Sequence, residues 1–256
     1  MRQISYPGSF ALLFVWSLGI GLLSSSLLAE AQESAKPKAV IELFTSQGCS
    51  SCPPADKLLG KLAKRDDVIA LTLPVDYWDY LGWKDTLAKP QYSKRQRSYA
   101  QARGDRQVYT PQVVINGRTH AVGSRKGAVN AAIRKVTKQL SNSFVAIKIS
   151  VKDDKIIVDL GEAPRGLKRH KGTLWMATIT NSVPVKIKRG ENHGRNITYS
   201  NVVKSLKPIG EWNGSNQKLV FNKKDFMGKG ADGCTVFLQQ GKSGQIIGAA
   251  ELKSWL

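Results

Sequence analysis

Two cysteines with two serines between them form the part of this chain whose residue types and spacing are suited to chemistry. Cys49-Ser50-Ser51-Cys52 stands between a short apolar run and a predicted helix. At the first turn of a helix, the unpaired amides and the helix dipole stabilise a thiolate, and a second sulfur one turn further on can close a ring with the first. The spacing therefore predicts a redox-active dithiol.

The same spacing occurs in structural disulfides and in zinc sites, which are the alternative interpretations. Zinc needs two more ligands, usually a second pair of Cys or His residues. Cys234 is far away in the sequence, and the histidines are scattered: His120, His170 and His193. We therefore expect no metal and no other cofactor at this pair. Cys234 itself is expected to be a small buried residue, with intermolecular pairing as the alternative.

Two further positions are candidates for the same site. Pro111, preceded by Thr110, stands just before a predicted strand, where a cis-proline would face the dithiol and leave backbone groups open for an extended substrate. The alternative is an ordinary proline at the first position of a strand. Glu42 lies inside an apolar strand shortly before the dithiol. It is a candidate general base for Cys52 if it is buried, and a solvent-facing residue otherwise.

An aromatic segment follows the second predicted strand, at residues 76–85. Loops at the carboxyl ends of such strands line the functional edge of an open α/β sheet. Tyr77, Trp78 and Asp79 are therefore candidates for a substrate groove near the dithiol. The alternative is that Trp78 and Trp83 fill the core beneath an inserted helical stretch.

The elements that must position these residues follow an alternating order. Apolar runs predict strands at residues 39–44 and 68–75, and helical spacing predicts helices at 53–65 and 91–103. Asn116-Gly117 predicts a hairpin between 113–115 and 119–122, and a last helix is expected over 124–140. This order predicts an α/β, thioredoxin-like domain over residues 37–141.

From residue 144 the pattern changes to short alternating runs typical of strands. We expect a mostly β domain over 144–256, arranged as an antiparallel sandwich. Residues 199–206 fit strand and helix periodicity equally well.

The first 31 residues have the order of a secretory signal peptide. Arg2 precedes an apolar run over 10–23, and Ala29-Glu30-Ala31 offers a cleavage site before Gln32. An uncleaved anchor is the alternative, because residues 9–28 approach the length that spans a bilayer. The mature protein is expected to be periplasmic or secreted and to contain no transmembrane segment.

The net charge of +20 at pH 7 limits the choice of partners. In an exported protein, the counter-charges are anionic envelope components or acidic client proteins rather than nucleic acid, with plain solubility as the alternative.

Several sequence blocks resemble the family called domain of unknown function 1223. The first block runs from Ile41 to Asp56, and the others are Val75 to Asp85, Tyr109 to Gln112, Gly190-Glu191-Asn192 and Asn201-Val202-Val203. The resemblance covers the mature chain and implies a secreted thioredoxin-like protein of the bacterial envelope, with no assigned reaction. Pro74 is a departure, because the family often has a histidine there.

These features predict an exported thiol–disulfide oxidoreductase that exchanges disulfides with client or redox-partner proteins. The alternative is an envelope-associated binding protein in which Cys49 and Cys52 form a permanent disulfide.

Overall fold

A computed structural model describes residues 1, 3, 39–228, 230–241 and 243–255. Apart from residues 1 and 3, the predicted signal peptide at residues 1–31 lies outside the described residues. Residues 32–256 are grouped as one compact unit. Within the part that the structure describes, every helix is too short or too polar to cross a membrane.

The first half of this unit alternates strands and helices. In chain order it contains β1 (Ala39–Thr45), α1 (Pro53–Leu62), β2 (Val68–Pro74), the short helix η1 (Asp79–Leu81), α2 (Pro90–Arg103), β3 (Gln112–Ile115), β4 (Thr119–Val122) and α3 (Lys126–Leu140). β1 pairs in parallel with β2 and antiparallel with β3, and β4 pairs antiparallel with β3. Asn116 and Gly117 both have positive φ, as the tight turn between β3 and β4 requires.

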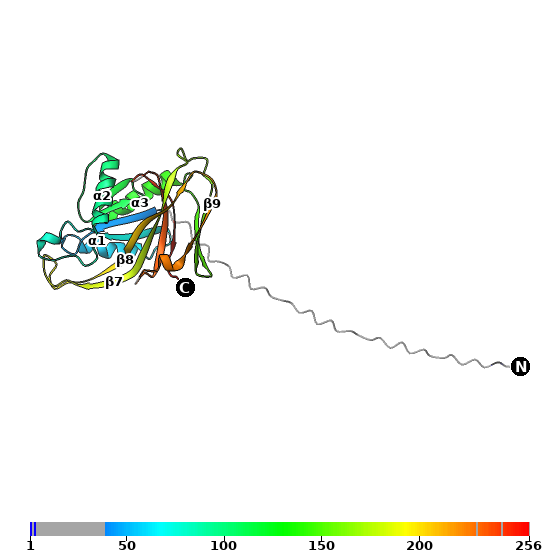
Figure 1. Cartoon of the computed structure of the whole chain (residues 1–256), viewed down its shortest axis with the longest axis horizontal. Helices are drawn as coiled ribbons and strands as arrows, with labels where there is room; N and C mark the ends of the chain where they lie inside the picture. The colour runs from blue at the N-terminus through cyan, green and yellow to red at the C-terminus, as the bar shows by residue number, and fades with distance from the viewer. Residues whose placement is uncertain (2, 4–38, 229, 242, 256) are drawn as a thin grey trace. The chain divides into compact units, whose positions relative to one another are not determined.

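The second half is built of strands. It contains β5 (Ile147–Lys152), β6 (Lys155–Leu160), β7 (Gly172–Lys186), β8 (Asn196–Trp212), β9 (Gln217–Asn222), the short helix η2 (Lys223–Asp225), β10 (Gly233–Gln239) and β11 (Ile246–Leu252). β7 and β8 form a long antiparallel hairpin, and the segment 199–206 lies inside β8. Figure 1 shows α1 and α2 toward one end of the unit, β9 at the other end and α3 between them.

The predicted antiparallel sandwich needs a correction, because most strands of the second half extend the sheet of the first half. In the described residues, the larger sheet has the order β11-β10-β7-β8-β2-β1-β3-β4, and β5, β6 and β9 form a separate three-stranded sheet. Thr72 of β2 pairs with Val202 of β8. The side chain of Asn201 reinforces this junction by donating to the Ala70 carbonyl at 3.0 Å. The boundary predicted near residue 144 therefore marks a change in connectivity rather than a break in the sheet.

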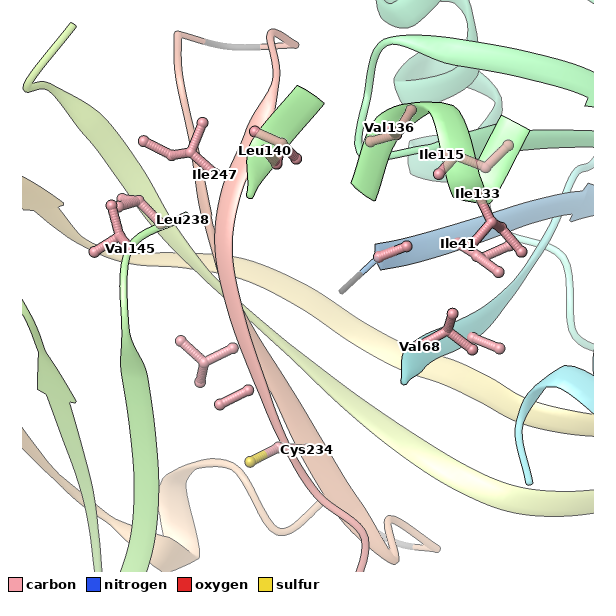
Figure 2. Packing of buried hydrophobic residues seen from close by; sticks show 14 of the residues in the cluster. Ile41, Val68, Ile115, Ile133, Val136, Leu140, Val145, Cys234, Leu238 and Ile247 are labelled. Carbon is pink, nitrogen blue, oxygen red and sulfur yellow. The ribbon is translucent and has the colours of Figure 1, made fainter. Parts of the chain in front are cut away.

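The two faces of the larger sheet bury different elements. On one face, Ile41 and Leu43 of β1 belong to a cluster with α1, α3 and the smaller sheet. On the other face, Val40 and Phe44 belong to a cluster with the tyrosines of α2. Figure 2 shows the first cluster, in which residues of β1, β2 and β3 share a core with residues of β10 and β11. The alternation of β1 thus places α1 and α2 on opposite faces of the sheet.

Candidate functional site

The dithiol occupies the short loop between β1 and α1. Cys49 and Cys52 form a disulfide, and their exposures are 2% and 0%, whereas Ser50 and Ser51 between them are exposed. Pro53 and Pro54 open α1, where a missing N–H removes no internal helix bond. The amides of Ala55 and Asp56 both donate to the Cys52 carbonyl. The second cysteine is therefore fixed at the start of the helix.

Gln47 anchors this loop to the aromatic segment. Its amide N–H donates to Asp85 Oδ2 at 2.8 Å, and its side-chain oxygen accepts from Trp83 Nε1 at 2.8 Å. The side-chain amide of Gln47 also donates to Thr86 Oγ1. Trp83 is half-buried and acts here as a support for the loop before Cys49.

Trp78 links the dithiol loop to the segment that contains Pro111. Its indole N–H donates to Thr110 Oγ1 at 2.7 Å, and the peptide bond between Thr110 and Pro111 is cis. Gly48 lies so close to Trp78 that a Cβ at Gly48 would sit 3.2 Å from Trp78 Cβ. Pro111 also lies near the first turn of α1, because a Cβ at Gly123 would meet both Pro111 Cβ and Ala55 Cβ. Thr110 and Pro111 are thus brought to the dithiol, and their role toward a substrate stays a prediction.

The other two predicted groove residues lie around Trp78. Tyr77 packs against Trp78 and donates its hydroxyl to Gln96 Oε1 at 3.1 Å. Asp79 accepts from the Asp85 amide at 3.0 Å. Tyr80, which is 77% exposed, stacks on Trp78. Tyr77 and Trp78 are half-buried and also pack against the core on the α2 face. The segment therefore contributes to that core and presents an aromatic surface next to the dithiol loop, and its use as a groove stays a prediction.

Glu42 does not lie at the dithiol. Its carboxylate is buried on the α2 face of β1, where Arg95 Nε donates to it at 2.6 Å and the Tyr99 hydroxyl also donates. α1 covers the other face, so the sheet separates Glu42 from Cys52. The general-base hypothesis therefore fails on placement for Glu42, because its position in the strand directs its side chain to the opposite face.

A different carboxylate, Asp56, lies below the dithiol. It follows Cys52 by four residues in a helical backbone, so the two side chains share one face of α1. Thr45 Oγ1 donates to Asp56 Oδ1 at 2.8 Å, while Oδ2 is buried and has no partner among the described residues. Burial raises the pKa of Asp56 to about 7, and the charge of Asp85 adds to this rise. The four-residue spacing from Cys52 is the sequence signal that points to Asp56.

Asp85 and Tyr199 complete this buried group. Three backbone amides, those of Gln47, Leu87 and Ala88, donate to Asp85. Burial is the main reason that the pKa of Asp85 is raised to about 6. Burial and the two carboxylates also raise the pKa of the Tyr199 hydroxyl. Burial thus raises the pKa of Asp56 toward neutral pH at a position beneath the disulfide, whereas Glu42 lies on the far face of the sheet.

The loop between β7 and β8 also touches the dithiol loop. Asn192 donates its side-chain amide to the carbonyls of Gln47 and Cys49, both at 2.9 Å. Glu191 Oε2 accepts from the Ser50 amide at 3.2 Å. More than 140 residues separate these partners in sequence. The only sequence signal at the block Gly190-Glu191-Asn192 is its family resemblance.

The remaining cysteine and histidine positions form no shared centre with the dithiol. Cys234 is buried in β10, where desolvation raises the pKa of its thiol to about 12. His120 bonds through its ring nitrogens to the Tyr109 hydroxyl and to Asp105. Within the described ranges, there is no cluster of three or more His, Cys, Asp or Glu side chains suited to a metal ion.

Comparisons with known proteins give one partial and two extended similarities. A probable thioredoxin from Archaeoglobus fulgidus is 46% identical over 37 residues, which is 14% of this chain and 41% of that protein. The chain thus matches less than half the length of this curated relative. The HBP35 structure from Porphyromonas gingivalis superposes with a TM-score of 0.55 at 13% identity, over 87% of this chain and 77% of that one, which is a likeness of fold alone.

The crystal structure of protein AGR_C_4864 from Agrobacterium tumefaciens is much more similar. It is 32% identical, with a TM-score of 0.74, and the match covers 85% of this chain and 94% of that chain. The family profile described as "Protein of unknown function (DUF1223)" matches residues 40–239, a range that includes the dithiol, the aromatic segment, Thr110-Pro111 and the β7–β8 loop. This chain belongs to the DUF1223 family.

Proposed function

We propose that this protein is an exported, thioredoxin-like thiol–disulfide oxidoreductase that exchanges disulfides with client or redox-partner proteins of the cell envelope. The observation that carries the proposal is the disulfide between Cys49 and Cys52 at the start of α1, in a loop that Trp78 links to Thr110 and Pro111. The partial similarity to a probable thioredoxin supports it. The apolar N-terminal run and its cleavage site support export.

The reaction would proceed by two thiolate displacements. In the reducing direction, the Cys49 thiolate attacks one sulfur of a client disulfide, forms a mixed disulfide and releases one client thiolate. The Cys52 thiolate then attacks the Cys49 sulfur and releases the second client thiolate, so that two electrons pass to the client. Asp56, one helical turn below Cys52, would accept the proton that the Cys52 thiol loses to become this attacking thiolate.

The first experiment asks whether the disulfide opens. The purified mature protein is equilibrated with mixtures of reduced and oxidised glutathione, alkylated and analysed by intact mass. We expect a reversible two-electron transition, with a potential well below that of strong periplasmic oxidants at about −120 mV. A pair that stays closed in every glutathione mixture contradicts the proposal.

The second experiment traps the partner. A Cys52→Ser variant retains the attacking sulfur but cannot resolve a mixed disulfide. It should therefore accumulate adducts with envelope proteins that disappear on reduction. The matched control is the double variant Cys49→Ser with Cys52→Ser, which should form none. Equal recovery from both variants would show that the captured proteins are not attached through Cys49.

A second candidate is a binding protein for an anionic envelope component, with a permanent disulfide. Two observations favour it. Both sulfurs are buried, and a cavity of about 570 Å³ beside α1 is lined by Lys57, Lys61, Lys64 and Lys253. This candidate predicts that the double serine variant still binds an acidic polysaccharide or anionic vesicles as tightly as the wild type. If replacing both Lys57 and Lys61 by Gln abolishes this binding, the binding site is the lysine-lined cavity.

A further inference from the structure

The loop between β7 and β8, residues 187–195, is here called the strap because it crosses beside the dithiol loop. The strap belongs to the second half of the chain, but it bonds to three positions at and around the first cysteine. Asn192 donates to the carbonyls of Gln47 and Cys49, and Glu191 accepts from the Ser50 amide. The dithiol is therefore held by a segment outside the β1–α1 unit that carries it.

The strap has a defined conformation. Backbone hydrogen bonds join Ile187 to Arg195 and Gly194 to Ile187, and further ones close its tip. Gly190 has a φ of +75° and lies so close to Trp83 that a Cβ there would be 3.1 Å from Trp83 Cβ. Trp83 in turn donates to Gln47. The strap, the aromatic segment and the dithiol loop thus form a closed ring of contacts that fixes where Glu191 stands.

Asn192 supplies the rigid part of this arrangement. Its side chain is 1% exposed, and its single amide group serves two carbonyls of the dithiol loop. Each such bond to a buried carbonyl removes the cost of leaving that carbonyl without a donor. Glu191 is the next residue in the chain and is exposed. Its carboxylate is consequently held at the amide that directly follows Cys49.

This placement acts against the thiolate that appears when the disulfide is reduced. A thiolate at a helix N-terminus is stabilised by free amides and by the helix dipole. Here Pro53 and Pro54 supply no N–H, and the Ser50 amide is already bonded to Glu191. The strap thus occupies an amide that could stabilise the Cys49 thiolate and places the negative charge of Glu191 beside it.

We propose that Glu191 is a positioning residue that opposes the Cys49 thiolate and makes the Cys49–Cys52 pair a weaker oxidant than the same dithiol without it. The inference rests on the proposed function only for its biological use, because the half-reaction itself needs no client. Reduction breaks the Cys49–Cys52 bond with two electrons and leaves a thiol or thiolate at each sulfur, depending on pH. Glu191 disfavours the thiolate form at Cys49, so it favours the disulfide whenever that form is populated.

Other charged groups surround the pair and are the same residues in wild type and in the Glu191 variant. Asp56 from α1 and Asp85 from the aromatic segment lie beneath it and act in the same direction as Glu191. The strap itself also carries the cations Lys188, Arg189 and Arg195 and the titratable His193. The test therefore compares variants that differ only in the carboxylate.

The experiment measures the equilibrium of the pair with a dithiothreitol redox buffer, from pH 6 to pH 9, for wild type and Glu191→Gln. Glutamine keeps the acceptor oxygen for the Ser50 amide but removes the charge. At pH 9 we expect the variant to favour the dithiol about threefold more than wild type, the size of an exposed charge–charge interaction, which corresponds to about 15 mV. At pH 6, where the thiols are protonated, the difference should vanish. Thiolate absorbance should give a midpoint about half a pH unit lower in the variant.

Two controls separate charge from structure. Glu211→Gln removes an equivalent exposed carboxylate at the far end of the same hairpin, where Glu211 bonds to Thr173, and it should leave both readouts at wild-type values. Glu191→Asp retains the charge and should remain close to wild type. Equal equilibria for wild type and Glu191→Gln at pH 9 would overturn the inference, as would a difference that does not change with pH. Failure of the proposed function would appear separately, as a wild-type pair that dithiothreitol opens but glutathione does not.

Discussion

At the scale of single residues, two buried carboxylates of this chain are accommodated in opposite ways. Glu42 is matched by the guanidinium of Arg95 and the hydroxyl of Tyr99. Asp56 has only the Thr45 hydroxyl on one oxygen, and burial raises its pKa to about 7. A buried carboxylate without a cation takes up a proton more readily, because burial disfavours its charged form. Asp56 is therefore the group beneath the dithiol that changes charge near neutral pH.

The titration of Asp56 makes a prediction about stability. The pKa of Asp56 in the folded protein is above the ordinary value of 3.8. Its contribution to the free energy of unfolding is therefore fully present below pH 3.8 and is lost as the pH rises through 7. Asp56→Asn removes this loss. The free energy of unfolding of the variant, relative to wild type, should rise by about 2–3 kcal/mol between pH 5 and pH 8.

Urea denaturation at several pH values measures this difference. Asp225→Asn, at an exposed position in η2, is the matched control and should give a difference that stays flat. If the free energies of unfolding of Asp56→Asn and wild type change in parallel between pH 5 and pH 8, the Asp56 carboxyl does not titrate in that pH range.

At the scale of elements, α2 is locked to β1 through a buried polar network on the face opposite the dithiol. Arg95 bonds to Glu42, Tyr99 and Gln239, and its guanidinium lies over the rings of Tyr99, Trp175 and Phe237. Elements from both halves of the chain meet at this one side chain. The network therefore fixes the position of α2 rather than taking part in exchange.

This assignment separates stability from redox chemistry. Arg95→Met leaves the Glu42 carboxylate buried without a cation and should lower the free energy of unfolding by about 3–5 kcal/mol. Adding Glu42→Leu removes that carboxylate, and the double variant should recover much of the loss. The equilibrium of the Cys49–Cys52 pair with glutathione in the folded double variant should equal that of wild type. A changed equilibrium would return Glu42 to the list of residues that act on the dithiol.

At the scale of the whole molecule, the two halves are joined by a sheet and by a core. β2 pairs with β8, so the edge that β2 would otherwise expose is covered by the second half. The core cluster on the α1 face includes Ile41 and Val68 as well as Leu238 and Ile247, as Figure 2 shows. Separation of the halves would expose both an apolar surface and an unpaired strand edge.

A truncated chain tests this dependence. A fragment of residues 32–143 should lack a cooperative unfolding transition and a dispersed amide spectrum, because it loses the strands that cover β2 and part of the core. The full chain from residue 32 is the control and should unfold cooperatively. A fragment that folds cooperatively alone would establish residues 37–141 as an independent domain.

Local features of the sequence predicted much of the secondary structure and the location of the dithiol. The alternation of apolar residues indicated β5 and β6, Asn116-Gly117 indicated the β3–β4 turn, and the residues before Cys49 and after Cys52 indicated a strand-to-helix junction. These features depend on neighbouring residues, through backbone sterics and hydrogen bonds that form within a few positions. The predicted first helix was a few residues too long, since α1 ends at Leu62.

Only the tertiary structure decided which distant residues reach the dithiol. Strand alternation is symmetric, so it showed that Glu42 and Leu43 face opposite ways but not which face carries α1. The pairing of β2 with β8 placed the strap beside the dithiol, and no local pattern at residues 190–192 specifies that contact. The sequence by itself determined that Cys49 and Cys52 stand at the start of a helix. The spacing of four residues along α1 likewise places Asp56 beneath Cys52. Long-range packing determined that Asp85 joins Asp56 there and that Glu191 lies beside the pair, because contacts between distant segments depend on the whole sheet being formed.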